Sequence, residues 1–293
     1  MKNKYCASVI IPTYNRSKLL EGTLKSLLEQ DINKEKFEAI IIDDGSTDNT
    51  RQVVDKYRDK INIKYIYQQH VGFRVAAARN LGIKSSEGAI CIFVDSGVLL
   101  KKDAINENIK IHSSSKEYAV IGYMYGFDEY NENEEKILSM NVEPLNVDKY
   151  IELLEKEKVF DMREKLYRDL GDDLTKWPAP WVIFWTGYAS ARREILIKVG
   201  MFDERFNTWG GEDTDIALAM YTNGVEIIMN RNLKSIHMPH DKFKTNMSEE
   251  ELKKRGKEKK EFIHSKYKLK STEAYINTSS MELNYIMMNK RTV

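Results

Sequence analysis

The first 125 residues alternate between short apolar runs and amphipathic stretches, and this alternation restricts the fold more than any other feature of the chain. The apolar runs that we interpret as strands are residues 5–11, 37–43, 61–67 and 89–94. The stretches between them favour helices, because apolar side chains recur there at helical spacing, as the leucines of residues 17–30 do. Repeated strand–helix order predicts an α/β fold with a mainly parallel sheet and helices on both faces.

Three residues mark the expected carboxyl ends of these strands. Pro12, Asp44 and Asp95 each follow an apolar run. Ligands of open α/β sheets bind at the carboxyl ends of the strands, so we expect the three residues to face one crevice. Asp95 directly follows the apolar run "CIFV", where an unpaired buried charge is costly, and we therefore expect it to hold a ligand.

Composition excludes several classes of protein. The 46 basic and 45 acidic residues nearly cancel, which argues against a general nucleic-acid binder. No window approaches 18 uninterrupted apolar residues and the first residues do not resemble a signal peptide, so we expect no transmembrane segment and a cytoplasmic location. The two cysteines, Cys6 and Cys91, lie in apolar runs and are expected to be reduced. The oligomeric state stays open.

Five motifs, in order, resemble a known family. They are "SVIIPTYNR", "IIDDGSTDNT", "AARNLGI", "IFVDSG" and "TGYASARREILIKVGMFDERFNTWGGEDTDIALAM". Together they resemble the nucleotide-sugar glycosyltransferases of family 2. The last motif also resembles the C-terminal part of β-1,4-galactosyltransferases and bacterial polysaccharide synthases. The resemblance implies the GT-A fold, which is Rossmann-like with a mainly parallel central sheet flanked by helices.

The resemblance also implies a division of the chain. Residues 1–125 would form the nucleotide-sugar-binding half, and residues 126–245 the acceptor-binding and catalytic half of the same continuous domain. The charged stretch 128–176 is expected to be a helical insertion. Residues 246–293 are polar and Lys-rich, and we interpret them as a helical extension with mixed charges facing solvent, rather than a surface for an anionic acceptor or a membrane.

For the donor, the resemblance places four residues of the first motif around the uridine and diphosphate: Pro12, Thr13, Tyr14 and Arg16. Proline and an aromatic ring can wall a base, and arginine neutralises phosphate. The alternative is an ordinary turn and helix start, capped by Asn15 or Ser17.

The next two motifs complete the expected donor site. Asp44 would accept a hydrogen bond from the uracil N–H, while Asp43 would brace the loop. Phe73 would stack on the donor and Arg74 would contact it, in preference to Arg79. The alternatives are turn chemistry for the two acids and a structural ion pair for the arginines.

The stretch "WGGED" is expected to bind the acceptor. Gly210 and Gly211 let the backbone approach a sugar, and Trp209 offers an apolar plate for a pyranose face. By resemblance Glu212 binds the acceptor and Asp213 is the general base. Plain capping of a helix by acids is the alternative, and it does not explain the preceding Trp-Gly-Gly.

Three tryptophans lie close together in "WPAPWVIFW". We expect Trp181 to line the acceptor cleft, with Trp177 as a further candidate, and the alternative is that both are core aromatics. Trp185 is interpreted as a core residue inside a strand.

The family pattern Asp-x-Asp is changed in this chain. Its second acid usually ligates Mn²⁺ or Mg²⁺ on the diphosphate, and Gly97 occupies that place. The resemblance therefore implies a weakly held divalent metal (Mn or Mg) bound by Asp95 and His237, with His237 favoured over His240. Mg²⁺ needs only one or two carboxylates because it keeps several waters. Alternatively no metal is used, and Arg16 or Arg74 offsets the leaving-group charge.

Two functions from different classes remain. The favoured one is an inverting glycosyltransferase that moves a hexose or N-acetylhexosamine from a nucleotide sugar, first of all a UDP-sugar, to a hydroxyl of a glycan, peptide or small-molecule acceptor. The other is a catalytically idle sugar-nucleotide-binding partner subunit, which Gly97 favours and the intact "GGED" opposes. A dehydrogenase is set aside because no G-x-G-x-x-G follows the first strand.

Overall fold

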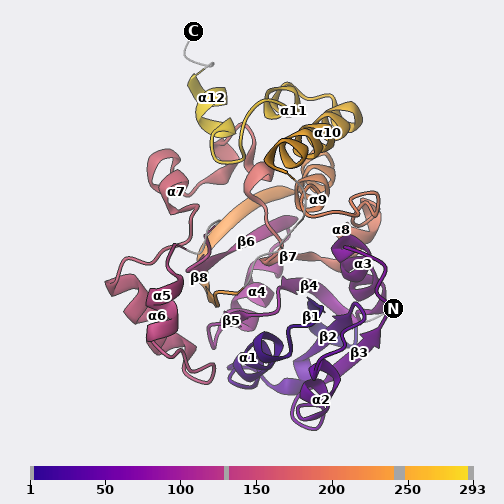
Figure 1. The fold of residues 1–293 in the computed structure, drawn as a ribbon, viewed down its shortest axis with the longest axis vertical. Coiled ribbons are helices and arrows are strands. Elements are labelled where there is room, and N and C mark those ends of the chain that lie inside the picture. The colour runs from indigo at the N-terminus through magenta and orange to yellow at the C-terminus, as the bar shows by residue number, and fades with distance from the viewer. Residues whose placement is uncertain (1–2, 129–131, 241–247, 290–293) are drawn as a thin grey trace.

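A computed structural model of the chain describes residues 3–128, 132–240 and 248–289 (Figure 1). The first 100 residues form the elements β1 (Tyr5–Thr13), α1 (Ser17–Leu28), η1 (Lys34–Lys36), β2 (Phe37–Asp43), α2 (Thr50–Asp55), β3 (Ile63–Tyr67), α3 (Val75–Ser85), β4 (Gly88–Val94) and β5 (Val98–Leu100). The first four strands are all parallel, in the spatial order β3-β2-β1-β4. The predicted strand–helix alternation is confirmed.

The second half of the sheet is mixed. Its elements are α4 (Ala104–His112), β6 (Tyr118–Tyr125), β7 (Tyr188–Arg192), α8 (Arg193–Lys198), α9 (Glu212–Thr222) and β8 (Glu226–His237). The full order of the described strands is β3-β2-β1-β4-β7-β6-β8-β5, and four of their seven pairings are parallel. The α/β fold class is therefore confirmed, with the antiparallel pairings gathered around β7 and β5.

The expected insertion between β6 and β7 is helical, as predicted. It contains α5 (Glu134–Ser139), α6 (Val147–Lys156), α7 (Glu164–Leu170), η2 (Leu174–Lys176) and η3 (Pro180–Ile183). The prediction that Trp185 lies in a strand is wrong, because it falls in the loop between η3 and β7 and is half-buried. There its ring packs against Phe127 at a centroid distance of 5.5 Å.

The C-terminal extension folds as α10 (Glu249–Tyr267), α11 (Lys270–Tyr275) and α12 (Leu283–Asn289). Figure 1 shows α10 and α11 at the same end of the molecule as α9. The extension is helical as expected, but it is more than a solvated helix. Ile263, Tyr275 and Leu283 are buried in the larger of the two main hydrophobic clusters.

The core lies on both faces of the sheet because the parallel strands are covered by helices on each side. Every residue of β2 is buried. Along β1, Val9 and Ile11 face one cluster while Ile10 faces the other, as the two-residue period of a strand requires. Cys91 is buried and both cysteines are unpaired, as predicted.

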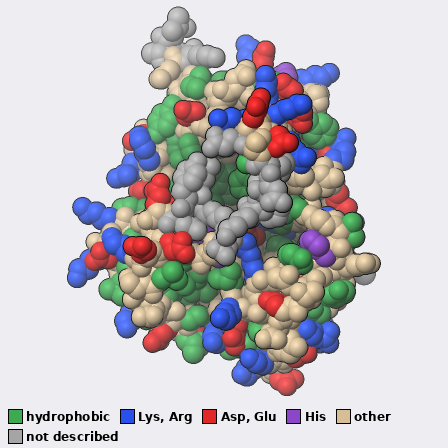
Figure 2. Space-filling view, in the orientation of Figure 1, with side chains coloured by type: hydrophobic (Ala, Val, Ile, Leu, Met, Phe, Trp, Pro, Cys, Tyr) green, Lys and Arg blue, Asp and Glu red, His purple; other side chains and the backbone are tan. Residues whose placement is uncertain are grey.

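The surface in Figure 2 shows basic and acidic side chains interspersed, which agrees with the near balance of charge. Within the described ranges, none of the helices has the length and apolar character needed to cross a membrane.

Candidate active site

The ends of the first, second and fourth strands meet at one edge of the sheet, as the sequence predicts. The backbone N–H of Asp44 donates to the carbonyl of Thr13 at 2.9 Å, which joins the ends of β2 and β1. The hydroxyl of Ser96 donates to the carbonyl of Pro12 at 3.0 Å, which joins the turn after β4 to β1. Backbone and side-chain bonds thus hold the expected donor residues at one edge.

The guanidinium of Arg79 is the centre of the charged part of this edge. It is buried on α3, where small alanine neighbours leave it room to cross between elements. Its Nη2 donates to Asp95 Oδ1 at 3.2 Å, and its Nη1 lies 3.3 Å from both Glu212 Oε1 and Asp213 Oδ1. One cation therefore connects the carboxylate after β4 with the two carboxylates that open α9.

The stretch "WGGED" places the two acids in the first turn of α9. Gly210 and Gly211 have φ angles of 86° and 101°, which L side chains rarely adopt. A Cβ on Gly211 would also lie 2.6 Å from the Phe206 ring, so glycine is needed there for two reasons. The glycines let the chain turn sharply into the helix, and Glu212 and Asp213 then face Arg79.

The two acids of α9 have raised pKa values. Burial, followed by the charge of Asp213, raises the pKa of Glu212 to about 7. Burial also raises the pKa of Asp213, although Arg79 and Thr186 counteract it. For Arg79, burial alone would lower the pKa, but the three carboxylates raise it, so the guanidinium stays charged. Burial thus moves both carboxyl pKa values upward, toward the pH range where a general acid–base group is most effective.

Asp213 and Glu212 differ in their access to solvent. Asp213 accepts hydrogen bonds from the Thr186 hydroxyl and, at 3.2 Å, from the Thr186 backbone N–H. Its side chain keeps 20% exposure, against 7% for Glu212. A substrate hydroxyl can therefore reach Asp213 more readily, while Thr186 fixes the orientation of its carboxylate.

The Asp44 carboxylate lies in a second polar cluster at the end of β2. Oδ1 accepts from Arg74 at 3.0 Å and from Gln68 at 2.5 Å, and Oδ2 lies 3.0 Å from His70 Nδ1. Asp43 braces the loop, as expected, because it accepts from the Ser46 N–H at 2.8 Å and from a tyrosine hydroxyl.

An aromatic pair covers this cluster. The rings of Tyr14 and His70 are stacked, with centroids 4.1 Å apart and an interplanar angle of 7°. Tyr14 is 41% exposed, so part of it is within reach of a ligand. The sequence did not single out His70 as a partner of Tyr14, and the stacking of Phe73 on the donor stays a prediction.

The start of α1 is organised by its neighbours. Neither Asn15 nor Ser17 caps the helix with its side chain; instead Asp48 Oδ2 accepts from the Ser17 N–H at 2.9 Å. A pocket of about 380 Å³ lies here, lined by Asn15, Arg16, Ser17, Lys18, Leu19, Asp48 and His240. A helix start with two cationic side chains suits a diphosphate.

Arg16 connects this pocket to the loop after β8. Its Nη1 lies 2.9 Å from His240 Nε2, and its charge also interacts with Asp95. Because arginine can only donate, His240 Nε2 accepts, and its Nδ1–H donates to the Met238 carbonyl at 3.1 Å.

The turn containing Gly97 lies beside the expected histidine ligand. Gly97 has a φ of 103°, and a Cβ there would lie 3.1 Å from Leu19. Val98 pairs with His237 across the β5–β8 ladder, and the Met238 N–H donates to the Gly97 carbonyl at 3.0 Å. The backbones carrying Asp95 and His237 are therefore neighbours, although a side chain at position 97 would be strained.

Asp95 and His237 are chemically suited to a divalent ion, provided that a bound diphosphate supplies further oxygen ligands. The Asp95 side chain is 41% exposed. Its Oδ1 accepts from Arg79, so Oδ2 is the oxygen that could bind an ion. No cluster of three or more His, Cys, Asp or Glu ligands occurs within the described parts of the chain. One carboxylate and one imidazole suit Mn²⁺ or Mg²⁺ when phosphate oxygens and water complete the shell.

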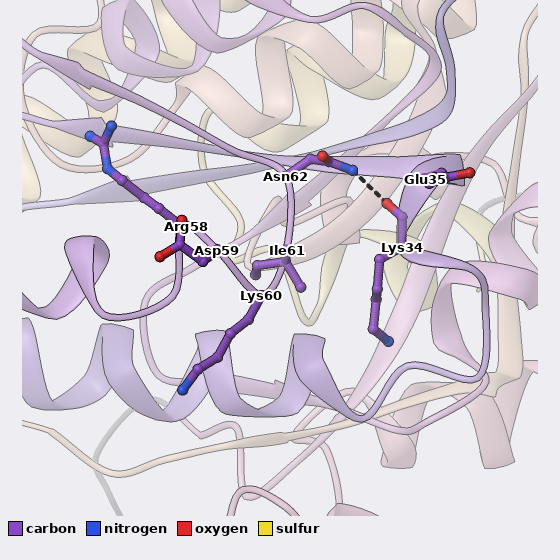
Figure 3. A pocket seen from close by; sticks show the side chains of 7 residues that line it. All are labelled: Lys34, Glu35, Arg58, Asp59, Lys60, Ile61 and Asn62. Carbon is purple, nitrogen blue, oxygen red and sulfur yellow. Dashed lines mark hydrogen bonds between the residues drawn. The ribbon is translucent and has the colours of Figure 1, made fainter.

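A second pocket, of about 140 Å³, lies at the opposite end of the parallel strands (Figure 3). Its lining residues are Lys34, Glu35, Arg58, Asp59, Lys60, Ile61 and Asn62. The Asn62 amide donates to the Lys34 carbonyl at 2.6 Å, which ties η1 to the start of β3. This pocket lies before the strands begin, so it is separate from the site at their carboxyl ends.

Comparison with known proteins decides the family. The sequence pattern of glycosyl transferase family 2 matches residues 8–200, and that of the N-terminal domain of galactosyltransferase matches residues 169–242. The chain belongs to glycosyl transferase family 2. The resemblance predicted from the five motifs is confirmed, and the two matched ranges together contain Asp44, Asp95 and the stretch "WGGED".

A curated relative extends this match. Validoxylamine A glucosyltransferase of Streptomyces hygroscopicus subsp. jinggangensis is 36% identical over 237 residues, covering 80% of this chain and 56% of the relative. The chain thus spans about half the length of the curated relatives that it matches first.

Solved structures confirm the GT-A fold of this family 2 chain. S. aureus TarS in complex with UDP-GlcNAc has a TM-score of 0.64 at 20% identity, covering 92% of this chain and 71% of that one. The mannosyltransferase PcManGT of Pyrobaculum calidifontis, in complex with GDP-Man and Mn²⁺, has a TM-score of 0.62 at 18% identity, covering 98% and 75%.

One predicted site residue does not reach the surface of the site. Trp181 is fully buried, with its ring 5.5 Å from that of Tyr275 on α11, and Trp177 is also buried. Its position counts against the acceptor contact expected for it. The spacing of three tryptophans did not separate a cleft wall from a core, because both use the same apolar residues.

Several residues of the site were missed or underrated from the sequence. Arg79 was ranked below Arg74, yet it connects three carboxylates. Thr186 and His70 were not singled out, although each contacts an expected acid. The position of Arg79 among alanines was an available signal, since small neighbours leave space for a buried arginine.

Proposed function

We propose that this family 2 protein is an inverting glycosyltransferase that moves a hexose or N-acetylhexosamine from a UDP-sugar to an acceptor hydroxyl. The observation that carries the proposal is the convergence of Asp95, Glu212 and Asp213 on the buried guanidinium of Arg79. It sets a basic carboxylate with a raised pKa beside the expected sugar-nucleotide edge of the sheet. The structural neighbour TarS was solved in complex with UDP-GlcNAc, which supports a UDP-sugar as the donor.

The nucleotide is held by the clusters at the ends of β1 and β2. Asp44 accepts the uracil N–H, and the exposed part of Tyr14 contacts the base. Thr13 supports this assignment, because its hydroxyl is buried without a hydrogen-bond partner in the described part of the chain. Arg16 and the start of α1 take the diphosphate, where two cations and helix N–H groups favour negative charge.

Transfer proceeds by attack of the acceptor hydroxyl on the anomeric carbon. Asp213 removes the hydroxyl proton as the new C–O bond forms, and the bond to the diphosphate breaks on the opposite side, which inverts the configuration. Glu212 and Trp209 bind the acceptor sugar. Arg79 keeps the base oriented and, through Asp95, connects it to the leaving-group side of the site.

A divalent ion is the proposed cofactor, with Asp95 and His237 as its protein ligands. Such an ion, held by these two residues, would supply Lewis-acid neutralisation of the charge on the diphosphate. The PcManGT complex, which contains Mn²⁺, supports this choice. His240 is the second candidate ligand, because its ring lies 5.1 Å from that of His237, but its Nε2 would have to leave Arg16 before it could bind an ion.

The idle partner subunit remains a second candidate, and Gly97 favours it because no side chain there can ligate a metal. The complete Asp213, Thr186 and Arg79 arrangement favours the enzyme.

One experiment separates the enzyme from the idle subunit. Purified protein is incubated with UDP-glucose or UDP-GlcNAc, with and without validoxylamine A as a first probe acceptor, and UDP release is followed. The choice of acceptor comes from the name of the 36%-identical relative. Acceptor-dependent UDP release supports transfer. Binding of UDP without release from either donor, over a panel of acceptors, would favour the idle subunit.

A further inference from the structure

One face of helix α10 contacts the loop Thr208–Gly211, which is expected to bind the acceptor, and the first turns of α9. Lys259 Nζ lies 3.4 Å from the Thr208 carbonyl and 2.5 Å from the Trp209 carbonyl. Lys266, seven residues later, places its Nζ 2.7 Å from Asp215 Oδ2. Seven residues are two helical turns, so the two lysines lie on the same side of α10.

Apolar contacts between the two lysines support this arrangement. The Phe262 ring packs edge-on against Phe206, with centroids 5.6 Å apart. Ile263 is buried. The Tyr267 hydroxyl donates to the Asp215 carbonyl at 2.9 Å. The far end of α10 is therefore anchored on α9, and Lys259 extends from this anchored face to the loop.

The middle of the loop, at Trp209 and Gly210, is open, whereas Gly211 lies against the Phe206 ring. Trp209 is 69% exposed, and a Cβ built on Gly210 would meet nothing within 4 Å. Gly210 and Gly211 lack side chains that would limit their backbone. A loop of this kind samples several conformations unless its carbonyl groups are held.

Lys259 is not an ordinary solvated lysine. It is half-buried, and burial lowers its pKa, although the nearby charge of Glu212 acts in the opposite direction. A partly desolvated ammonium needs hydrogen-bond acceptors, and the two loop carbonyls provide them. Its aliphatic part also lies 3.5 Å from where a Gly211 Cβ would be.

We propose that Lys259 is a positioning residue for glycosyl transfer, which holds the loop Thr208–Gly211 so that Trp209 and the start of α9 present one fixed surface to the acceptor sugar. The inference rests on the proposed function, and it gives the C-terminal extension a part in acceptor binding. Lys259 acts through the loop and does not contact the reacting atoms.

The chain contains a closely matched control. Lys260 is the next residue, is also half-buried, and donates to the Thr278 carbonyl at 2.6 Å, within the extension. Lys259→Met removes the contacts of one lysine with the two loop carbonyls, and Lys260→Met removes the contact of its neighbour with the Thr278 carbonyl. Lys259→Arg keeps a cation and donors within reach of the same carbonyls.

The first measurement is hydrogen–deuterium exchange of the 293-residue chain without ligands. Loss of a charge-assisted hydrogen bond should speed exchange in peptides covering residues 206–211 by about tenfold in Lys259→Met. Lys260→Met and Lys259→Arg should leave these peptides close to the parent protein. Unchanged exchange of the loop in Lys259→Met would overturn the proposal whether or not the protein is a transferase.

The second measurement is transfer from UDP-glucose to validoxylamine A, or to the acceptor that the preceding screen identifies. Lys259→Met should raise the acceptor KM by about tenfold, with kcat and UDP affinity changed much less. If the acceptor KM rises and the UDP affinity falls by the same factor, the damage is general and the positioning role is refuted. Failure of the parent protein to transfer to any acceptor contradicts the proposed function instead, and the exchange experiment then decides the loop contact by itself.

Discussion

Arg79 and Asp213 form a hydrogen-bonded ion pair of 3.3 Å across 134 residues of chain. Arg79 belongs to α3 in the first half of the sheet, and Asp213 opens α9 in the second half. The proposed base is therefore oriented by the half of the domain that we expect to bind the donor. Substitutions in one half should alter the chemistry of the other.

Replacing the proposed base should abolish most of the transfer activity. Asp213→Asn keeps the shape of the side chain and a hydrogen-bonding oxygen for Thr186 but cannot accept the acceptor proton. A positioned general base contributes typically 10²–10⁴-fold, so kcat should fall by about that factor. UDP affinity, measured by calorimetry, should stay within about twofold. Asp169→Asn, in an exposed acid of α7, serves as the control, and normal turnover by Asp213→Asn would remove Asp213 from this role.

The pH dependence of transfer should follow the coupled acids of α9. Burial raises the pKa of Asp213, and it raises that of Glu212 to about 7. A base works only when ionised, so kcat/KM should fall as the pH drops below about 7, with an apparent pKa that belongs to the pair. Rates over pH 5–9 test this, and a flat profile down to pH 5 would contradict it.

Removing the central cation should destabilise the protein in a pH-dependent way. Arg79→Met leaves three carboxylates without their shared partner, which costs about 3–5 kcal/mol when a buried pair is broken. Carboxyls with raised folded-state pKa values stabilise the fold when protonated, and this stability is lost as the pH rises from about 4.5 to about 7. Because the charge of Arg79 lowers the pKa of both α9 acids, its removal raises these values further, and more stability is lost with rising pH in the variant than in the parent. The destabilisation measured by urea unfolding should therefore be larger at pH 8 than at pH 5.5. An equal loss at both pH values would show that packing, and not charge, is what Arg79 supplies.

Recognition of the uracil ring of the nucleotide should depend on the Asp44 carboxylate. Asp44→Asn loses the charge that accepts from a uracil N–H and from Arg74. UDP affinity should fall by about 10–100-fold, as expected for a charge-assisted hydrogen bond. Cytosine lacks the ring N–H, so CDP provides the comparison: the parent protein should prefer UDP, and Asp44→Asn should show little preference. A preserved preference for UDP would mean that another group reads the ring.

Metal binding should need both Asp95 and His237. Electron paramagnetic resonance of Mn²⁺ added to the protein with UDP measures binding without relying on activity. Asp95→Ala and His237→Ala should each weaken Mn²⁺ binding by at least about tenfold. His264→Ala is the control, because His264 pairs with Thr272 within the C-terminal extension. Unchanged Mn²⁺ affinity in both variants, or full transfer in EDTA, would favour charge neutralisation by Arg16 instead.

The sequence predicted the architecture of the first half because local and periodic signals agree there. Apolar runs of strand length, separated by helical spacing, admit few arrangements other than a parallel sheet covered by helices. Pro12, Asp44 and Asp95 follow those runs, and we therefore expected them at one edge of the sheet. The hydrogen bonds between the strand ends confirm that these three residues lie together. The stretch "WGGED" likewise predicted a glycine turn that opens α9.

Contacts between distant segments decided the rest. Trp181 and Trp185 carry the same apolar signal in the sequence, yet only the packing of α11 buries one fully against Tyr275. Arg79 has three carboxylate partners that lie 16, 133 and 134 residues away, and no local pattern encodes such a pairing.

The C-terminal extension shows the same division most clearly. Its Lys-rich composition determined that it is a polar helix. The tertiary structure decided that Lys259 contacts the carbonyls of Thr208 and Trp209. A helix has a defined face only relative to the surface on which it packs, and Phe206 and Asp215 set that surface for Phe262 and Lys266.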